Sequence, residues 1–223
     1  MIDHESLPYG RRGDIRFHGC ISAPRRRGDP QLSSFRGRPE RTVVVYMHLR
    51  GFAMICIRHW HDDDSISTLT QLLHRAYRPL ADAGMRFVAS YQDESVTRQR
   101  IAKGVCFIAQ ESDNLIGTIV YYPPGTGKGC DWYEQAGVGY FGQFAVEPAC
   151  QRGGVGSQLL DHVEQYAREN HAAELALDTS ERAASLIAYY ARRGYRQVGH
   201  VQWRDTNYRS VVMSKALCVT LPG

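Results

Sequence analysis

The spacing of apolar and polar residues divides the chain at Met54. Residues 1–40 show neither the alternation of a strand nor the spacing of a helix, and they hold four prolines and the run Arg25–Arg27. Such a composition is typical of disordered segments. Residues 42–49 are apolar enough for a strand, but no flanking pattern supports one. The predicted organisation is a disordered leader over 1–53, a folded domain over 54–218 and a short tail over 219–223.

From Met54 onward the apolar positions recur with the periods of strands and helices. The seven predicted strands are 54–58, 105–109, 115–122, 140–146, 173–177, 195–203 and 208–214. The four predicted helices run from the capping acids Asp62–Asp64 to the breaks at Pro79 and Gly84, over 93–103, over 155–169, and from Ser180 or Glu181 to Arg193. Their order, β-α-α-β-β-β-α-β-α-β-β, predicts one α/β domain.

The net charge of +4, from 27 Lys and Arg against 23 Asp and Glu, belongs to the leader. Residues 1–53 carry ten Arg and five acids, whereas residues 54–223 carry a net charge of −1. The basic leader raises the alternative of a nucleic-acid-binding module. A charge run with so few aromatic residues is more typical of a solvated tail, so we do not expect nucleic acid as a partner.

Targeting signals and cysteine usage favour the cytoplasm. No run approaches the roughly 20 apolar residues that a membrane-spanning helix needs, so we expect no membrane partner. Acidic residues interrupt the N-terminus, which argues against a signal peptide or a transit peptide. The six cysteines are scattered without metal-ligand spacing, and we expect free thiols in a reducing compartment. We therefore predict a cytoplasmic protein without a metal.

Residues 143–157 carry the most informative pattern, a strand that runs into a glycine-rich turn and then opens a helix. The first N–H groups of a helix lack partners within the helix and lie at the positive end of its dipole. Glycines remove the Cβ atoms that would keep a diphosphate away from this backbone. By itself the pattern predicts phosphate binding and nothing narrower.

The turn also resembles a family signature. Its residues fit Q/R-x-x-G-x-G/A, with Gln151, Gly154 and Gly156 at the three diagnostic places. This is the acyl-CoA-binding signature of the GCN5-related N-acetyltransferases (GNAT). Two further segments, Phe144–Val146 and Tyr190–Tyr195, are similar to segments of that family, and so is the order of the elements.

The resemblance extends over about residues 54–217 and implies the GNAT fold. That fold is a mixed central sheet of about six to seven strands with helices on both faces, splayed between the fourth and fifth strands. Acetyl-CoA is the implied co-substrate, bound by its pyrophosphate at the turn and by its pantetheine arm along the fourth strand. The residues that the resemblance assigns to it are Phe144, Ala145, Val146, Gln151, Arg152, Gly153, Gly154, Val155, Gly156 and Ser157.

The implied reaction is N-acetylation of a primary amine, by direct attack of the amine on the thioester in a ternary complex. The acceptor, a small molecule or a peptide, stays open. A domain that binds acyl-CoA and regulates without turnover is the alternative to an enzyme.

Tyr190 is the predicted catalytic residue. The leaving thiolate has a pKa of about 8.5, and a phenol with a pKa near 10 can donate a proton to it. The spacing to Gly194 favours Tyr190 over its neighbour Tyr189, while a core aromatic is the alternative role. Where the family often has Asn this chain has Ala183, so the resemblance supports no side-chain contact to coenzyme A there.

No general base is visible in the sequence, because the fourth strand contains no acid. The candidates by proximity to the expected cleft are Asp131, Glu134 and His200, and solvent is the remaining candidate. An acceptor with apolar parts is suggested by four aromatic residues, which are otherwise core: Trp132, Tyr133, Trp203 and Tyr208.

Three further hypotheses concern other segments. The run PPGTGKG at residues 123–129 is similar to a nucleotide-binding P-loop, but Tyr122 and Gly129 replace the first glycine and the hydroxyl residue. We therefore predict a flexible loop there, and a lid over the acceptor site is a further hypothesis for it. Dimerisation through the last strands and a native start near Met54 rather than Met1 are the other two hypotheses.

Overall fold

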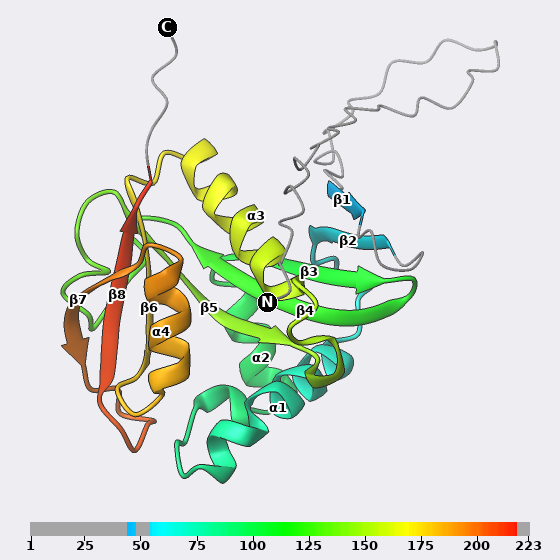
Figure 1. The fold of residues 1–223 in the computed structure, drawn as a ribbon, viewed down its shortest axis with the longest axis horizontal. Helices are drawn as coiled ribbons and strands as arrows, with labels where there is room; N and C mark the ends of the chain where they lie inside the picture. Colours follow the sequence, from blue (N-terminus) through cyan, green and yellow to red (C-terminus); the bar gives the residue numbers. More distant parts are fainter. Residues whose placement is uncertain (1–43, 48–53, 218–223) are drawn as a thin grey trace, which may run out of the picture. The chain divides into compact units, whose positions relative to one another are not determined.

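The computed structural model describes residues 44–47 and 54–217. Within them lie eight strands: β1 (Val44–Met47), β2 (Met54–His59), β3 (Val105–Glu111), β4 (Asn114–Tyr122), β5 (Val138–Val146), β6 (Glu174–Ser180), β7 (Arg196–Val201) and β8 (Ser210–Ala216). The same residues form four α-helices: α1 (Ile66–Asp82), α2 (Glu94–Ile101), α3 (Val155–Glu169) and α4 (Ala184–Arg192). From Met54 onward the order is the predicted one, which confirms the α/β fold (Figure 1).

The strands form one mixed sheet in the order β1-β2-β3-β4-β5-β6-β8-β7. β5 and β6 are parallel, and the other neighbouring pairs are antiparallel. β1 adds a strand to the seven predicted ones, and it precedes the domain boundary predicted at Met54. That boundary and the disordered leader stay predictions, because residues 1–43 and 48–53 lie outside the described part of the chain.

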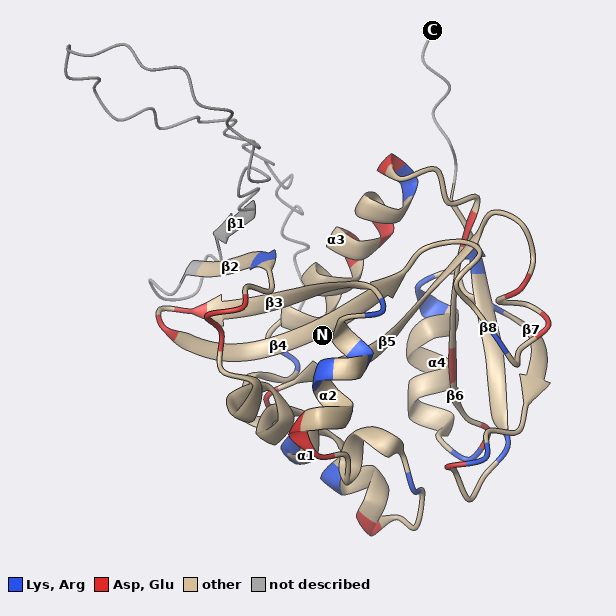
Figure 2. Ribbon diagram, turned by 180° about the vertical axis from the view of Figure 1, so that it is seen from behind, with Lys and Arg blue, Asp and Glu red and all other residues tan. Residues whose placement is uncertain are grey.

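The helices cover the two faces of the sheet in pairs. Along β4, Ile119 and Tyr121 belong to the core that contains α3 and α4, whereas Val120 belongs to the core that contains α1 and α2. This alternation follows from the two-residue period of a strand. One face therefore carries α3 and α4, and the other carries α1 and α2 (Figures 1 and 2).

The parallel pairing of β5 and β6 is short. It ends where Tyr140 lies opposite Ala176, although β6 continues beside β8 as far as Ser180. Within β5, Gln143 has φ 51° and the register with β4 shifts, so a β-bulge bends the strand. The two strands separate beyond Tyr140, which confirms the splayed sheet expected between the fourth and fifth predicted strands.

The start of α1 differs from the prediction. Ser65 caps the helix by accepting a hydrogen bond from Thr68 N at 3.2 Å, so the acids Asp62–Asp64 are not the cap. Asp64 instead accepts two hydrogen bonds from the Arg58 guanidinium, at 2.6 and 2.8 Å. A carboxylate that precedes the cap is free to pair with the strand it follows, and a bidentate arginine pair is stronger than a single cap bond.

Two further boundaries differ. α1 continues through Pro79 to Asp82, because a proline in the last turn removes only one helical hydrogen bond. β6 runs past its predicted end at Leu177 to Ser180, and α4 begins only at Ala184. The extension of β6 matters because it brings the following polar residues into the sheet.

The remaining expectations concern cysteines, metals and membranes. Free thiols are found, as expected, at Cys56, Cys106, Cys130 and Cys150, while Cys20 and Cys218 lie outside the described residues. Over residues 44–47 and 54–217 no group of three His, Cys, Asp or Glu side chains is placed to hold a metal ion. The helices described there are too short or too polar to cross a membrane. The absence of a metal in the reaction stays a prediction.

His162 of α3 tests the packing of this helix on the sheet. Its ring lies 4.7 Å from that of Phe107, and burial lowers the pKa of His162 to about 4. The unfolded chain binds a proton here below about pH 6.5, whereas the folded chain does so only near pH 4. We therefore expect the melting temperature to fall as the pH decreases from 6.5 to 4, and to fall less in His162→Gln. Equal pH dependence of the two proteins in scanning fluorimetry would contradict this.

Candidate functional site

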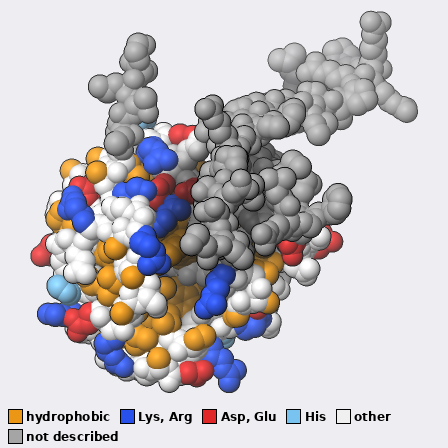
Figure 3. All heavy atoms as spheres, in the orientation of Figure 1, with side chains coloured by type: hydrophobic (Ala, Val, Ile, Leu, Met, Phe, Trp, Pro, Cys, Tyr) orange, Lys and Arg blue, Asp and Glu red, His pale blue; other side chains and the backbone are white. Residues whose placement is uncertain are grey.

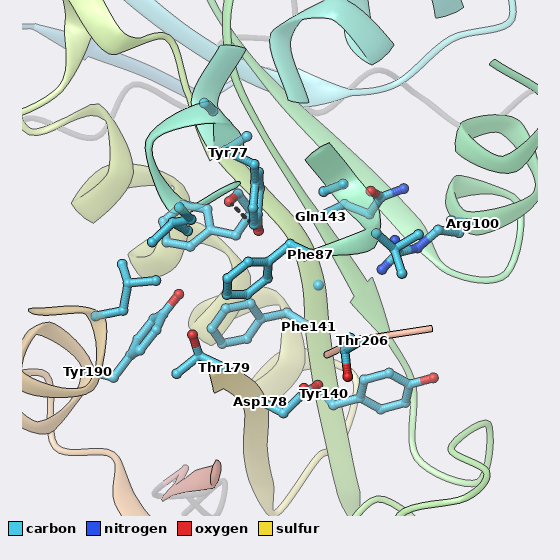
Figure 4. Close-up of a pocket in the computed structure, with 18 of the residues that line it drawn as sticks. Tyr77, Phe87, Arg100, Tyr140, Phe141, Gln143, Asp178, Thr179, Tyr190 and Thr206 are labelled. Atoms are coloured by element: carbon cyan, nitrogen blue, oxygen red, sulfur yellow. Dashed lines mark hydrogen bonds between the residues drawn. The ribbon is translucent and has the colours of Figure 1, made fainter. Parts of the chain in front are cut away.

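A cavity occupies the gap where β5 and β6 separate. Its volume is about 1020 Å³, and its walls come from α1, α2, β5, the start of α3, β6, α4 and residues 203–208. Figure 4 shows the lining side chains, and Figure 3 shows hydrophobic side chains gathered on the face of α3 and α4 with Lys and Arg side chains around them. The two substrates of a transfer reaction could therefore share one space.

The two sides of the cavity differ because side chains alternate along the strands. Phe141 and Tyr190 belong to the core on the side of α3 and α4. Tyr133 belongs to a separate cluster on the other face, against which Tyr140 packs. Different side chains therefore line the gap on the two faces of the sheet.

The glycine-rich turn forms part of the wall and opens α3. Gly154 is the N-cap residue with φ 89°, a left-handed conformation that residues with a Cβ rarely adopt. No side chain caps this helix, so its first N–H groups remain available to a ligand. The exposed Arg152 adds a positive charge to the same wall.

Eight of the ten residues predicted to bind coenzyme A line the cavity: Phe144, Ala145, Val146, Gln151, Arg152, Gly154, Gly156 and Ser157. Gly153 does not line it, and Val155 is buried in the core. A backbone N–H can still face a ligand when the side chain points away, so these two positions keep their predicted role as turn residues.

The edge of β5 turns backbone groups toward the gap. Glu147 N donates to Ile116 O at 2.8 Å, and Ala145 is the next residue of β5 that faces β4 in this register. Residues of an antiparallel ladder alternate between facing the partner and facing away. The N–H and C=O groups of Phe144 and Val146 therefore point away from β4.

Two side chains meet this edge at its carbonyl groups. The Tyr77 hydroxyl donates to Phe144 O at 3.1 Å (dashed in Figure 4), and Gln151 Nε2 donates to Val146 O at 3.1 Å. The N–H groups of Phe144 and Val146 then remain for an extended ligand that pairs with β5 as another strand would.

The residues present fit the pyrophosphate and pantetheine of acetyl-CoA. A Cβ at Gly156 would lie 3.4 Å from both Phe144 Cζ and Val146 Cγ2, so glycine leaves room between the start of α3 and the strand edge. The side chains of Gln143 and Thr179 line the cavity and are each 3% exposed, with polar atoms that lack a partner among the described residues. Unpaired polar groups in such a wall favour a polar ligand.

Tyr190 lies on α4 with its hydroxyl directed into the cavity (Figure 4). The side chain is 7% exposed and packs against Phe141 and Tyr195. Burial raises the pKa of Tyr190 well above its usual 10, so the phenol keeps its proton at neutral pH. Tyr189 lines the cavity as well, but its hydroxyl is buried without a partner among the described residues.

None of the three candidate bases lines the cavity: Asp131, Glu134 and His200 are exposed elsewhere. The cavity contains instead the carboxylate of Asp178, just past the predicted end of β6 at Leu177. Sequence reasoning missed it because the predicted strand ended too early. An acid that closes an apolar strand is the signal that could have found it.

Three of the four aromatic residues suggested for the acceptor line the cavity, namely Tyr133, Trp203 and Tyr208. Trp132 packs instead against the guanidinium of Arg196, at 5.5 Å from the ring centroid. Tyr133 stacks on Tyr140 with the ring centroids 4.3 Å apart, which fixes both rings in the wall.

Residues 123–129 form a packed loop and not a P-loop, since turns rather than a helix lead from them into β5. Gly129 N donates to Glu134 Oε1 at 2.7 Å, which closes the loop on itself. Lys128 lines the cavity, and movement of the loop as a lid stays a prediction.

Gly127→Ala tests how this loop supports Tyr133. A Cβ at residue 127 would lie 2.5 Å from Tyr133 Cβ and 2.6 Å from its carbonyl oxygen. Because the backbone of Tyr133 cannot move aside easily, we expect the free energy of unfolding to fall by about 1–3 kcal/mol. Gly199→Ala, where no atom lies within 4 Å, is the matched control. Equal denaturant midpoints for the two variants would show that the loop relaxes without cost.

Comparison with known sequences identifies the family. The sequence model of the Acetyltransferase (GNAT) family matches residues 66–195, more than half of the chain. The S-(2-succino)cysteine N-acetyltransferase of Bacillus subtilis (strain 168) is 29% identical over 154 residues, which cover 67% of this chain and 88% of that protein.

Solved structures show the same fold. The ribosomal-protein-S18-alanine N-acetyltransferase from Escherichia coli aligns with a TM-score of 0.57 and 16% identity, over 76% of this chain and 97% of that one. A GNAT family acetyltransferase from Elizabethkingia anophelis with acetyl-CoA bound aligns with a TM-score of 0.53 and 18% identity, over 73% of this chain and 98% of that one. The chain belongs to the GNAT acetyltransferase family and is an acetyl-CoA-dependent N-acetyltransferase.

Proposed function

We propose that the protein transfers the acetyl group of acetyl-CoA directly to a primary amine while both substrates occupy the cavity. The observation that carries this proposal is one cavity whose walls include the glycine-rich turn, the free edge of β5 and Tyr190. In this arrangement the coenzyme lies along β5, and the amine approaches from the side of α1 and α2. Holding two substrates in line supplies much of the rate of such a reaction.

Each part of the site has a role in the proposal. N–H groups between Gln151 and Ser157 bind the pyrophosphate at the start of α3. The backbone of Phe144 and Val146 pairs with pantetheine, and one N–H of this edge polarises the thioester carbonyl. Tyr190 gives its proton to the sulfur as the C–S bond breaks, and the amine nitrogen loses one proton as the C–N bond forms.

The proposed acceptor carries carboxylates besides its amine. Four basic residues line the cavity in addition to Arg152 of the turn: Arg100, Lys103, Lys128 and Arg204. Only Asp178 and Asp205 oppose them among the described lining residues. Figure 2 shows basic positions along α2, from which Arg100 comes. The name of the Bacillus subtilis relative specifies S-(2-succino)cysteine, a carboxylated amino acid, which agrees with this excess of positive charge.

The proposal is tested by isothermal titration with acetyl-CoA, followed by an amine panel monitored for release of free thiol. We expect acetyl-CoA to bind, and carboxylated amino acids such as S-(2-succino)cysteine to give a lower KM than matched amines without carboxylates. Failure of folded protein to bind acetyl-CoA would contradict the coenzyme site. A preference for amines without carboxylates would contradict the acceptor class.

Three sequence-based predictions remain to be tested, and they concern dimerisation, cellular location and nucleic-acid binding by the leader. Dimerisation through the last strands is tested by light scattering of the purified chain; among the described strands β7 lies at the edge of the sheet and has one neighbour, β8. The cytoplasmic location is tested by cell fractionation. A gel shift that disappears when residues 1–53 are deleted would contradict the expectation that the leader binds no nucleic acid.

A further inference from the structure

We infer that Asp178 binds the amino group of the acceptor and takes a proton from it, an inference that rests on the proposed function. No base was visible in the sequence, and the three candidates by proximity lie away from the cavity. Asp178 is the carboxylate that the fold itself places at the gap.

The backbone of β6 fixes where Asp178 lies. Ala176 is the last residue of β6 that pairs with β5, and Asp178 follows it on the same face of the sheet, where β5 has moved away. On its other edge the strand stays paired, with Asp178 opposite Val212 of β8. The carboxylate therefore projects from a rigid strand into the space that the splayed sheet opens.

Two neutral donors orient the carboxylate. The Tyr133 hydroxyl donates to Oδ1 at 3.0 Å, and Trp203 Nε1 donates to Oδ2 at 2.9 Å. A carboxylate offers about four lone-pair sites, so acceptor capacity remains on both oxygens. Among the described residues no Lys, Arg or His forms an ion pair with Asp178 within 4.0 Å. Its negative charge is thus held in place without a protein cation to neutralise it.

The surroundings of Asp178 suit an ammonium group. Aromatic rings from α1, β5 and the segment 203–208 line the same cavity, and the faces of such rings attract cations. The charge of Asp178 affects six titratable groups of the described residues: Tyr77, Cys130, Tyr133, Tyr140, Tyr190 and Tyr208. The pKa of each is raised, chiefly by burial, so all six stay protonated and uncharged at physiological pH and none adds a second negative charge beside Asp178.

The cavity wall has an acidic part at Asp178 and a basic part at Arg100, and this separation of charge would orient a charged acceptor. Tyr77, Tyr140 and Tyr208 lie within electrostatic range of both Asp178 and Arg100. Figure 4 shows Asp178 and Arg100 on separate parts of the wall. An amino acid fits this arrangement with its ammonium group at Asp178 and its carboxylates toward Arg100.

The proton balance of the step is simple. The acceptor arrives as R–NH₃⁺, and Asp178 accepts one proton to leave R–NH₂, whose lone pair attacks the thioester carbon. A C–N bond forms and the C–S bond breaks; the thiolate takes a proton from Tyr190, and the nitrogen returns one to the phenolate through the cavity. Asp178 then releases its proton to solvent, so one proton is released for each acetyl group transferred.

Asp178→Asn tests the inference with S-(2-succino)cysteine as acceptor. The amide keeps the shape of the side chain but loses the charge and the basicity. We expect kcat/KM for the acceptor to fall about 100-fold at pH 7, as when one partner of a buried charge pair is removed. The loss should shrink toward pH 10, where the amine arrives without its extra proton. The dissociation constant of acetyl-CoA should not change.

Asp131→Asn, an exposed acid that does not line the cavity, is the matched control and should keep wild-type kinetics. Equal kcat/KM in Asp178→Asn and wild type, or a loss that is the same at pH 7 and pH 10, would overturn the role of Asp178. If Asp178→Asn does not fold, Trp203→Phe decides the question. A several-fold loss that shrinks at high pH supports the inference, and unchanged kinetics overturn it.

The wild-type assay separates this inference from the function on which it rests. Wild-type protein that binds acetyl-CoA but releases no thiol with any amine overturns the proposed function, and the role of Asp178 with it. Wild-type turnover together with an unaffected Asp178→Asn variant overturns the inference alone.

Discussion

Replacing Tyr190 with Phe is expected to lower kcat about 100-fold, the size of effect typical for loss of a general acid. The phenol of Tyr190 points into the cavity, and its raised pKa keeps it protonated at neutral pH. The sulfur gains negative charge as the C–S bond breaks, and a protonated phenol stabilises that charge by donating a hydrogen bond and then its proton. Stopped assays of thiol release at saturating substrates measure kcat directly.

The dissociation constant of acetyl-CoA should stay within about twofold of the wild-type value, because the proton transfer belongs to the transition state and not to binding. Phe keeps the packing of the ring on Phe141 and Tyr195, so the melting temperature should change little. A large loss of stability together with the loss of activity would indicate that Tyr190 is a core residue.

Tyr189→Phe is the matched control. The two tyrosines are neighbours on α4, with ring centroids 5.2 Å apart, and both line the cavity. The spacing to Gly194 and the direction of the hydroxyl favour Tyr190. A larger loss of kcat in Tyr189→Phe than in Tyr190→Phe would show that Tyr189, and not Tyr190, donates the proton to the sulfur.

The sequence predicted the parts of the fold that depend on local pattern. α3 was predictable because its apolar stripe repeats with the helical period, and residues of that stripe, such as Val155, Leu159 and Val163, are buried in the core. The glycine-rich turn was predictable for the same reason, since Gly154 satisfies a local conformational need. Features that depend only on residues nearby in the sequence can be predicted without the tertiary structure.

The parts that were missed depend on contacts between distant segments. Asp178 becomes a site residue only because β5 leaves β6 after Tyr140 and because Tyr133 and Trp203 reach its oxygens. Nothing in the residues around position 178 encodes those partners. The cap of α1 was missed for a similar reason, since Asp64 pairs across to Arg58 and leaves the cap to Ser65.

Gly156→Val is expected to weaken acetyl-CoA binding by about 10- to 100-fold, as an overpacking cost of 1–3 kcal/mol would give. A Cβ at this position already lies 3.4 Å from Phe144 Cζ and Val146 Cγ2, and two further methyl groups would reach into the space beside the edge of β5. In the proposed arrangement the pantetheine arm passes through this space to reach the turn. Isothermal titration with acetyl-CoA measures the loss.

The graded substitution Gly156→Ala separates a blocked site from a damaged fold. Residue 156 lies in the first turn of α3 and its φ is not positive, so Ala is favoured there by helix propensity, and its single methyl group fills less of the space. Affinity should therefore fall from Gly to Ala to Val, while the melting temperature of the Ala variant stays at or above that of the wild type. Unchanged affinity in Gly156→Val would mean that the coenzyme does not pass between α3 and β5, and the assignment of the turn would then be wrong.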